Sequence, residues 1–214
     1  MTGVKLLRVY SSGSPAAAFV VAHGAGAGQT SPFMVRTAEE LARRGVSAAT
    51  FDFRYIEAGR HVPDPAAVLE ARWREAIEAA GHAFAGLPLF IGGKSMGGRI
   101  ASQVAAQGVP GLSGLVFLGY PLHPPGKPQQ RRDAHLPGIE EPMLFVQGSR
   151  DAFGTADEIR DLLPKLRRAT LHEVTGGDHS FKVPGRKGPG ADAVLDGVLD
   201  AVTAWMAGVR APAR

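Results

Sequence analysis

The sequence contains no cysteine, few aromatic residues and no long apolar run. Without cysteine, disulfide bonds and a cysteine nucleophile are both excluded, and we expect the chain in a reducing cytoplasm. Aromatic residues make up 7% of the chain, and the arginines behind its net charge of +4 are scattered in pairs. A nucleic-acid-binding chain typically gathers its basic residues in a stripe or a tail. We therefore expect a solvated basic surface and no nucleic-acid partner.

No apolar stretch approaches the roughly 20 residues that a transmembrane helix needs, so no membrane partner is expected. Residues 16–22 follow Lys5 and Arg8 and faintly resemble the core of a signal peptide, but the turn-forming residues 11–15 interrupt that pattern. We expect a buried strand there instead. With 44% hydrophobic residues in a chain of 214, the composition predicts a single domain over residues 1–214.

Predicted strands alternate with predicted helices along the whole chain. The strands are expected over residues 4–10, 17–22, 46–53, 87–91, 114–118, 143–146 and 170–174. Helices are expected over residues 31–44, 65–80, the segment that follows Met96, 156–163 and 191–207. Gly81 is expected to close the second of these helices. This alternation predicts an α/β fold with a mainly parallel, twisted sheet of about seven strands and helices on both faces.

Residues 87–99 carry the most informative motif. A short apolar run ends at Gly92 and Gly93, and Lys94, Ser95 and Met96 precede two further glycines. Residues 93–97 match Gly-x-Ser-x-Gly, the pattern of a nucleophilic serine at the apex of a tight strand–turn–helix. The glycines remove Cβ atoms that would collide where strand and helix close up, and the helix directs its free N–H groups toward the serine.

Residues 87–99 allow two other interpretations. A phosphate-binding P-loop would need glycine at position 88, where Pro88 stands. A glycine-rich turn with an idle Ser95 stays open, because the motif alone is only moderately specific.

A serine nucleophile needs a base, and the base needs an orienting acid. One apolar strand leaves through a glycine turn to Asp151, and a later strand leaves through glycines to His179. Ligands of open parallel sheets bind at the carboxyl ends of the strands, so Ser95, Asp151 and His179 are expected to meet there. Asp157 and Glu158 are rival acids in a predicted helix.

Neither a cofactor nor a metal is predicted. The glycines at 24, 26 and 28 suggest a dinucleotide-binding loop, but Gln29 and Ser31 stand where its fingerprint requires glycine. No His-Glu-x-x-His or comparable ligand spacing occurs. Asp178, next to His179, is a further rival acid, although neighbouring side chains usually point in different directions.

Four motifs in order resemble a known family. They are His23-Gly24-Ala25-Gly26, Gly93-Lys94-Ser95-Met96-Gly97-Gly98-Arg99, Gln147-Gly148-x-x-Asp151 and Gly177-Asp178-His179-Ser180. Over nearly its whole length the chain resembles the small cap-less α/β-hydrolases of the dienelactone-hydrolase superfamily. It is most similar to the branch that contains a testis-expressed hydrolase-like protein and a subunit of a histone-acetyltransferase regulatory complex.

The resemblance implies an α/β-hydrolase fold and a role for each motif. Ser95 would be the nucleophile, Asp151 the acid and His179 the base, with the backbone N–H groups of Ala25 and Met96 as oxyanion-hole donors. Dienelactone hydrolases proper use a cysteine, so their substrate is not implied here. The expected function is that of a carboxylesterase-like serine hydrolase that cleaves small soluble esters through an acyl-enzyme intermediate.

The proline-rich segment 119–141 is too short for a substantial helical lid. It predicts an open, shallow site, without a cap domain, bordered by Tyr120, Leu122 and His123. Two alternatives stay open. The branch includes members regarded as scaffolds, which allows a non-catalytic binding module, and peroxide could replace water at the same triad in a perhydrolase-type reaction. The sequence does not indicate an oligomeric state.

Overall fold

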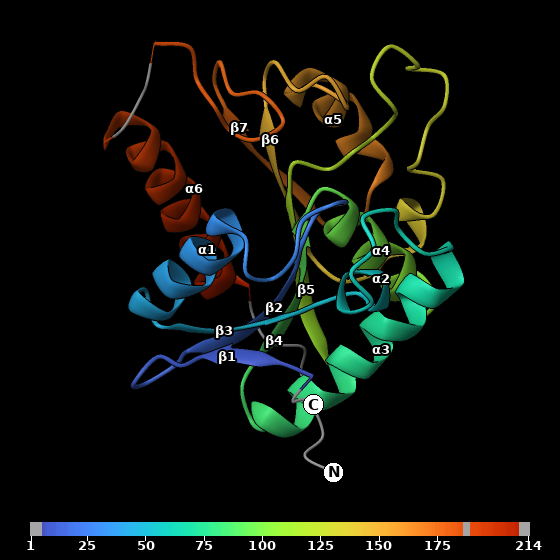
Figure 1. Cartoon of the computed structure of the whole chain (residues 1–214). Helices are drawn as coiled ribbons and strands as arrows, with labels where there is room; N and C mark the ends of the chain where they lie inside the picture. Colours follow the sequence, from blue (N-terminus) through green and yellow to red (C-terminus); the bar gives the residue numbers. More distant parts are fainter. Residues whose placement is uncertain (1–5, 186–188, 210–214) are drawn as a thin grey trace.

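Seven strands form one sheet in the order β1-β3-β2-β4-β5-β6-β7 in the computed structural model, which describes residues 6–185 and 189–209 (Figure 1). The strands are β1 (Arg8–Tyr10), β2 (Ala17–Ala22), β3 (Val46–Phe51), β4 (Leu89–Lys94), β5 (Leu112–Leu118), β6 (Met143–Gly148) and β7 (Ala169–Val174). Only the pairing of β1 with β3 is antiparallel among these ladders. The predicted, mainly parallel sheet of about seven strands is confirmed.

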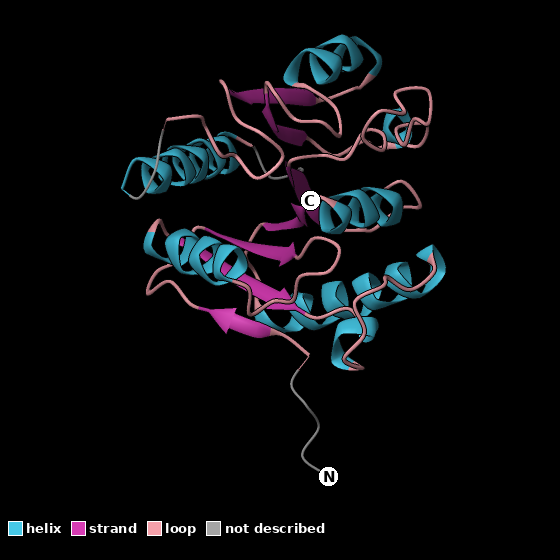
Figure 2. Cartoon of the chain, turned by 45° about the horizontal axis from the view of Figure 1, so that its top comes forward, coloured by secondary structure: helices cyan, strands magenta, loops and turns pink. Residues whose placement is uncertain are grey.

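Helices cover both faces of the sheet (Figure 2). They are α1 (Pro32–Arg43), α2 (Arg54–Glu57), α3 (Ala66–Ala83), α4 (Met96–Ala105), α5 (Ala156–Leu162) and α6 (Pro189–Gly208), with short 3₁₀ turns at Leu136–Gly138 and Leu163–Lys165. One apolar core joins the sheet to α3, α4 and α5, and a second joins it to α1 and α6. None of the helices in the described residues is long and apolar enough to cross a membrane.

Strand β2 shows why the sequence reads as a continuous apolar run. It lies between β3 and β4, and all six of its residues are buried. Val20 packs into one core and Phe19 and Val21 into the other. A central strand of a parallel sheet has no solvated face, so both sets of side chains must be apolar.

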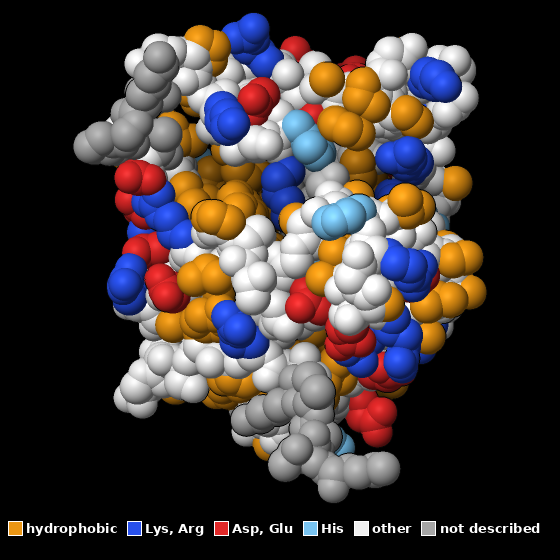
Figure 3. Space-filling model, in the orientation of Figure 1, with side chains coloured by type: hydrophobic (Ala, Val, Ile, Leu, Met, Phe, Trp, Pro, Cys, Tyr) orange, Lys and Arg blue, Asp and Glu red, His pale blue; other side chains and the backbone are white. Residues whose placement is uncertain are grey.

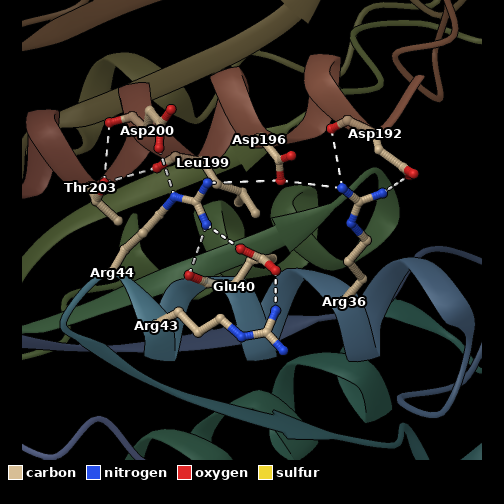
Figure 4. A network of polar contacts seen from close by, with 9 residues as sticks. All are labelled: Arg36, Glu40, Arg43, Arg44, Asp192, Asp196, Leu199, Asp200 and Thr203. Atoms are coloured by element: carbon tan, nitrogen blue, oxygen red, sulfur yellow. Dashed lines mark hydrogen bonds and ion pairs between the residues drawn. The ribbon is translucent and has the colours of Figure 1, made fainter. Parts of the chain in front are cut away.

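Charged side chains tie α6 to α1 across the second core (Figure 4). Arg36 pairs with Asp192 and Asp196, and Arg44 pairs with Asp196, Asp200 and Glu40. Exposed pairs contribute at most about 1 kcal/mol each. Their shared partners form a network that fixes the register of the two helices, and α1 also carries one wall of the cavity described below.

The structure differs from the prediction at several ends. The helix expected to stop at residue 80 continues to Ala83, and Gly81 is exposed and helical within it. The chain turns only at Gly86, with φ +87°. Helix α2 was not predicted. Residues 4 and 5 of the first expected strand lie outside the described residues. Between β5 and β6 the chain forms a loop with a single 3₁₀ turn, which leaves no helical cap in this described segment.

The first turn of α4 lies in backbone contact with the end of β2. A Cβ atom on Gly97 would lie 2.5 Å from the carbonyl oxygen of Ala22 and 2.7 Å from that of His23. The indole N–H of Trp73 donates to the carbonyl of Gly97 at 3.1 Å. No residue but glycine fits at this position without a backbone shift.

We expect Gly97→Ala to lower the free energy of unfolding by about 2 kcal/mol or more, because the added methyl group must displace backbone. Urea denaturation measures the change. Gly81→Ala, in the last turn of α3 where a Cβ would meet no atom within 4 Å, is the matched control and should raise the free energy of unfolding by about 0.5 kcal/mol. A Gly97→Ala variant as stable as wild type would contradict the close approach.

Candidate active site

Ser95 occupies the turn between β4 and α4 in a strained conformation. Its φ is 51° and its ψ is −115°, and it is one of two non-glycine residues with positive φ in the described chain. Such a conformation costs about 1–3 kcal/mol. Backbone bonds on both sides hold it, from the Ser95 N–H to the Leu118 carbonyl at 3.1 Å and from the Arg99 N–H to the Ser95 carbonyl at 3.0 Å. The serine side chain therefore stands at the apex of a rigid turn.

Ser95, His179 and Asp151 form one hydrogen-bonded chain. The Nε2 atom of His179 lies 2.8 Å from the Ser95 hydroxyl, and its Nδ1 atom lies 2.7 Å from Asp151 Oδ2. The three side chains follow β4, β6 and β7, whose carboxyl ends meet at one edge of the sheet. With a proton on Nδ1, the ring donates to the carboxylate and Nε2 is free to accept the serine proton.

Buried groups hold Asp151 in place. Its carboxylate is 1% exposed and accepts the backbone N–H of Phe153 at 2.8 Å and the side-chain amide of Gln147 at 2.9 Å. Gln147 also accepts the Tyr120 N–H at 2.8 Å and donates to the Gly154 carbonyl at 2.6 Å. This one buried amide joins the end of β6 to the loop that follows β5.

The His179 ring and its loop are held from two sides. The ring of Phe153 lies against the imidazole, with 4.3 Å between ring centroids. The Lys94 ammonium donates to the His179 carbonyl at 2.5 Å. Burial lowers the pKa of Lys94 from 10.5 to about 8. Asp178 does not orient the imidazole, because its carboxylate accepts the backbone N–H groups of Ser180 and Lys182.

The two expected oxyanion donors belong to residues that line the same cavity as Ser95. Met96 is the first residue of α4, so its N–H has no intrahelical acceptor. Ala25 lies in the loop after β2, where a Cβ on Gly24 would be 3.6 Å from the Ser95 Cβ. His23 supports this loop, because its Nδ1 lies 2.8 Å from the Gly24 carbonyl and its Nε2 accepts the Phe53 N–H. Burial lowers the pKa of His23 and favours the neutral ring this arrangement needs.

A cavity of about 780 Å³ opens over Ser95 (Figure 3). Apolar side chains from α1 and α3 form part of its wall, among them Phe33, Met34 and Leu69. Lys94, Arg99 and Arg132 form another part. The cavity therefore offers both apolar and cationic side chains to a ligand bound at the serine.

The structure corrects the expectation that Tyr120, Leu122 and His123 border the site. All three are buried, and they lie outside the lining of the cavity, to which the loop contributes Pro121 and Arg132. The Tyr120 ring packs between Phe117 and Phe145, and burial raises the pKa of its hydroxyl, which donates to the Arg132 carbonyl at 2.8 Å.

The other two side chains are drawn inward as well. Leu122 packs closely on Gly154. A Cβ atom added to Gly154 would lie 2.6 Å from the Cβ atom of Leu122. His123 lies 3.0 Å from Glu158 and 2.9 Å from the Pro124 carbonyl. The sequence predicted no role for Gln147, Phe153 or Arg132. For Gln147 a signal was present, because a glutamine at the end of an apolar strand is a polar residue at a buried position.

Among the residues the structure describes, no group of three or more His, Asp or Glu side chains could hold a metal ion. A serine on a strained turn, with a histidine–carboxylate pair at the same edge of a parallel sheet, is the architecture of the serine hydrolases of α/β type. Residues 15–207 match the family described as "Alpha/beta hydrolase domain", and the chain belongs to this family.

Solved structures share the fold at low sequence identity. A dienelactone hydrolase from Anabaena variabilis is 22% identical with a TM-score of 0.74, over 97% of this chain and 94% of that one. XC6422 from Xanthomonas campestris, an α/β serine hydrolase without a lid, is 20% identical with a TM-score of 0.72, over 97% and 90%. Est1E from Butyrivibrio proteoclasticus, solved with ferulic acid, is 15% identical with a TM-score of 0.67, over 95% of each chain. The predicted α/β-hydrolase fold is confirmed.

We expect Gln147→Met to lower the free energy of unfolding by about 2–4 kcal/mol, since buried backbone groups left without partners cost about 1–3 kcal/mol each. Thermal and urea unfolding measure the loss. Gln107→Met, at an exposed glutamine of the loop after α4, should change stability by less than about 0.5 kcal/mol. Equal stabilities of the two variants would show that the Gln147 amide holds nothing together.

Lys94 predicts a pH dependence of stability. Its pKa is about 8 when folded and 10.5 otherwise, so between pH 8 and 10 the unfolded chain binds more protons at this group. The free energy of unfolding of wild type, minus that of Lys94→Met, should rise over this range by up to about 1 kcal/mol per pH unit. Urea denaturation at several pH values measures the difference. A difference that stays flat or falls would mean that Lys94 is solvated.

Proposed function

We propose that this chain is a carboxylesterase-like serine hydrolase that cleaves small soluble esters. The observation that carries the proposal is the chain of contacts from Ser95 through His179 to Asp151, at 2.8 and 2.7 Å. A structural role alone does not require a serine in a strained turn at the opening of a cavity. The structural likeness to Est1E, and to an esterase from an Arctic metagenomic library, agrees with this assignment.

The geometry suits a two-step acyl transfer. His179 Nε2 takes the proton of Ser95 as its oxygen attacks the ester carbonyl, and Asp151 stabilises the imidazolium that forms. The N–H groups of Ala25 and Met96 hold the oxyanion, and each such donor typically contributes about 10²–10³ in turnover. His179 then gives its proton to the leaving alcohol. Water, deprotonated by the same ring, attacks the acyl-enzyme and releases the acid.

The form of the cavity limits the substrate. The described part of the segment between β5 and β6 provides no lid, so nothing there encloses a long lipid chain. On this ground we infer that the substrates are short esters. We also propose that the chain belongs to the cap-less branch of α/β-hydrolases that its four motifs resemble. A panel of p-nitrophenyl esters of graded chain length, compared by kcat/KM, ranks the acyl groups.

We expect a fluorophosphonate probe to label the wild type and spare Ser95→Ala, whose ester hydrolysis should fall by at least about 10³-fold. The matched control is Ser102→Ala. Ser102 lies on the same helix and is also 2.8 Å from a histidine, His135, but it is fully buried and outside the cavity. Labelling should survive this change. Absence of labelling in folded wild type would favour the binding-module alternative, and turnover that needs peroxide would favour a perhydrolase.

A further inference from the structure

Two arginines on the cavity wall have no anionic partner. The Nε atom of Arg99 is buried and makes no hydrogen bond, and the only side-chain contact of its guanidinium among the described residues is a long one, from Nη1 to the Gln103 amide oxygen at 3.4 Å. Arg132 is half-buried and, unlike its neighbour Arg131, which pairs with Asp133, makes no side-chain ion pair or hydrogen bond in the described part of the protein. Arg36 and Arg44, by contrast, are paired with carboxylates of α6. Unpaired, partly buried guanidinium groups are costly to retain.

Both arginines are fixed close to Ser95. Arg99 lies one turn after Ser95 on the same face of α4, about 6 Å along the helix. Helical side chains lean toward the N-terminus, which for Arg99 is the direction of the serine. Arg132 is held through its backbone, because its N–H donates to the Leu122 carbonyl at 2.9 Å and its carbonyl accepts the Tyr120 hydroxyl.

The charges around the cavity have one dominant sign. Lys94 and Lys182 add to the two arginines on its lining. Among the described residues that line it, Asp64 alone carries a carboxylate, of which one oxygen accepts Arg60 at 2.7 Å and the other is buried without a hydrogen-bond partner. The charge of Arg132 adds to burial, the larger cause, in lowering the pKa of Arg99. Both guanidinium groups line the same cavity as Ser95, so we expect a single anion bound there to reach both.

We propose that the cavity selects esters that carry a carboxylate, and that Arg99 and Arg132 bind this group while Ser95 attacks the ester carbonyl. The inference rests on the proposed hydrolase function. Planar guanidinium groups suit a carboxylate because each donates two parallel N–H bonds. The uncharged part of the substrate then contacts apolar side chains of the lining, among them Phe33, Met34 and Leu69.

Two matched esters test this preference. p-Nitrophenyl hemiadipate and p-nitrophenyl hexanoate share an acyl chain length and a leaving group, and they differ in the terminal carboxylate. For wild type we expect kcat/KM to be about tenfold to a hundredfold higher for the hemiadipate, mainly through KM, because the carboxylate binds equally in ground and transition states. A second pair, 4-butyryloxybenzoate and 4-butyryloxybenzamide, places the anion on the alcohol side.

The variants Arg132→Gln and Arg99→Gln should each lower the ratio of anionic to neutral kcat/KM about tenfold or more. The neutral ester is the internal reference for the fold and the triad of each variant. Arg131→Gln is the matched control. Its side chain is exposed, pairs with Asp133 and lies outside the cavity, so the ratio should not change.

Binding to Ser95→Ala tests the inference without turnover. By equilibrium titration this variant should bind the hemiadipate about tenfold to a hundredfold more tightly than the hexanoate. Adding Arg132→Gln should remove the difference. If wild type hydrolyses neither ester while this difference is present, the proposed function fails and the anion site stands. Equal affinity and equal hydrolysis within both pairs, or a preference that survives both arginine variants, would overturn the inference.

Discussion

The contact between the first turn of α4 and the end of β2 determines where the chemistry of this protein can occur. Gly97 lies so close to the Ala22 carbonyl that no side chain fits between helix and strand. Ser95 lies two residues before Gly97, in the turn between β4 and α4, and has strained dihedral angles. The same contact brings the loop after β2, with Ala25, beside the serine. One packing contact therefore positions both Ser95, the proposed nucleophile, and Ala25, a proposed oxyanion donor.

The buried amide of Gln147 is a second constraint. It holds Asp151, the proposed acid, and through this carboxylate it holds His179, the proposed base. It binds the Asp151 carboxylate and the backbone of Tyr120 and Gly154 at once. The loops after β5 and β6 therefore cannot move independently. The loop after β7, which carries His179, is tied to the elbow through Lys94. Ser95 is thus held by Leu118 of β5, His179 by Lys94 of β4 and Asp151 by Gln147 of β6, so the geometry is preorganised.

The sequence could predict what depends on local pattern. Continuous apolar runs predict buried strands, the glycines around Ser95 predict the elbow, and strand ends predict which side chains reach the sheet edge. It could not predict the direction of a side chain within a loop. Tyr120 and Leu122 follow a strand end just as Asp151 does, yet core space draws them inward and leaves Pro121 on the cavity. A role for Arg132 could be inferred only from the folded loop, which places this residue on the same cavity as Arg99.

Satisfied and unsatisfied groups are distributed unevenly in this molecule. Between α1 and α6 the charged side chains share partners in one closed network (Figure 4). Around the cavity, a strained serine, a buried lysine with a lowered pKa and two unpaired guanidinium groups lie together. Packing that served stability alone would relax these costs. Since the charged groups between α1 and α6 are paired, the concentration of unpaired groups at one opening is best explained by a ligand that completes them when it binds.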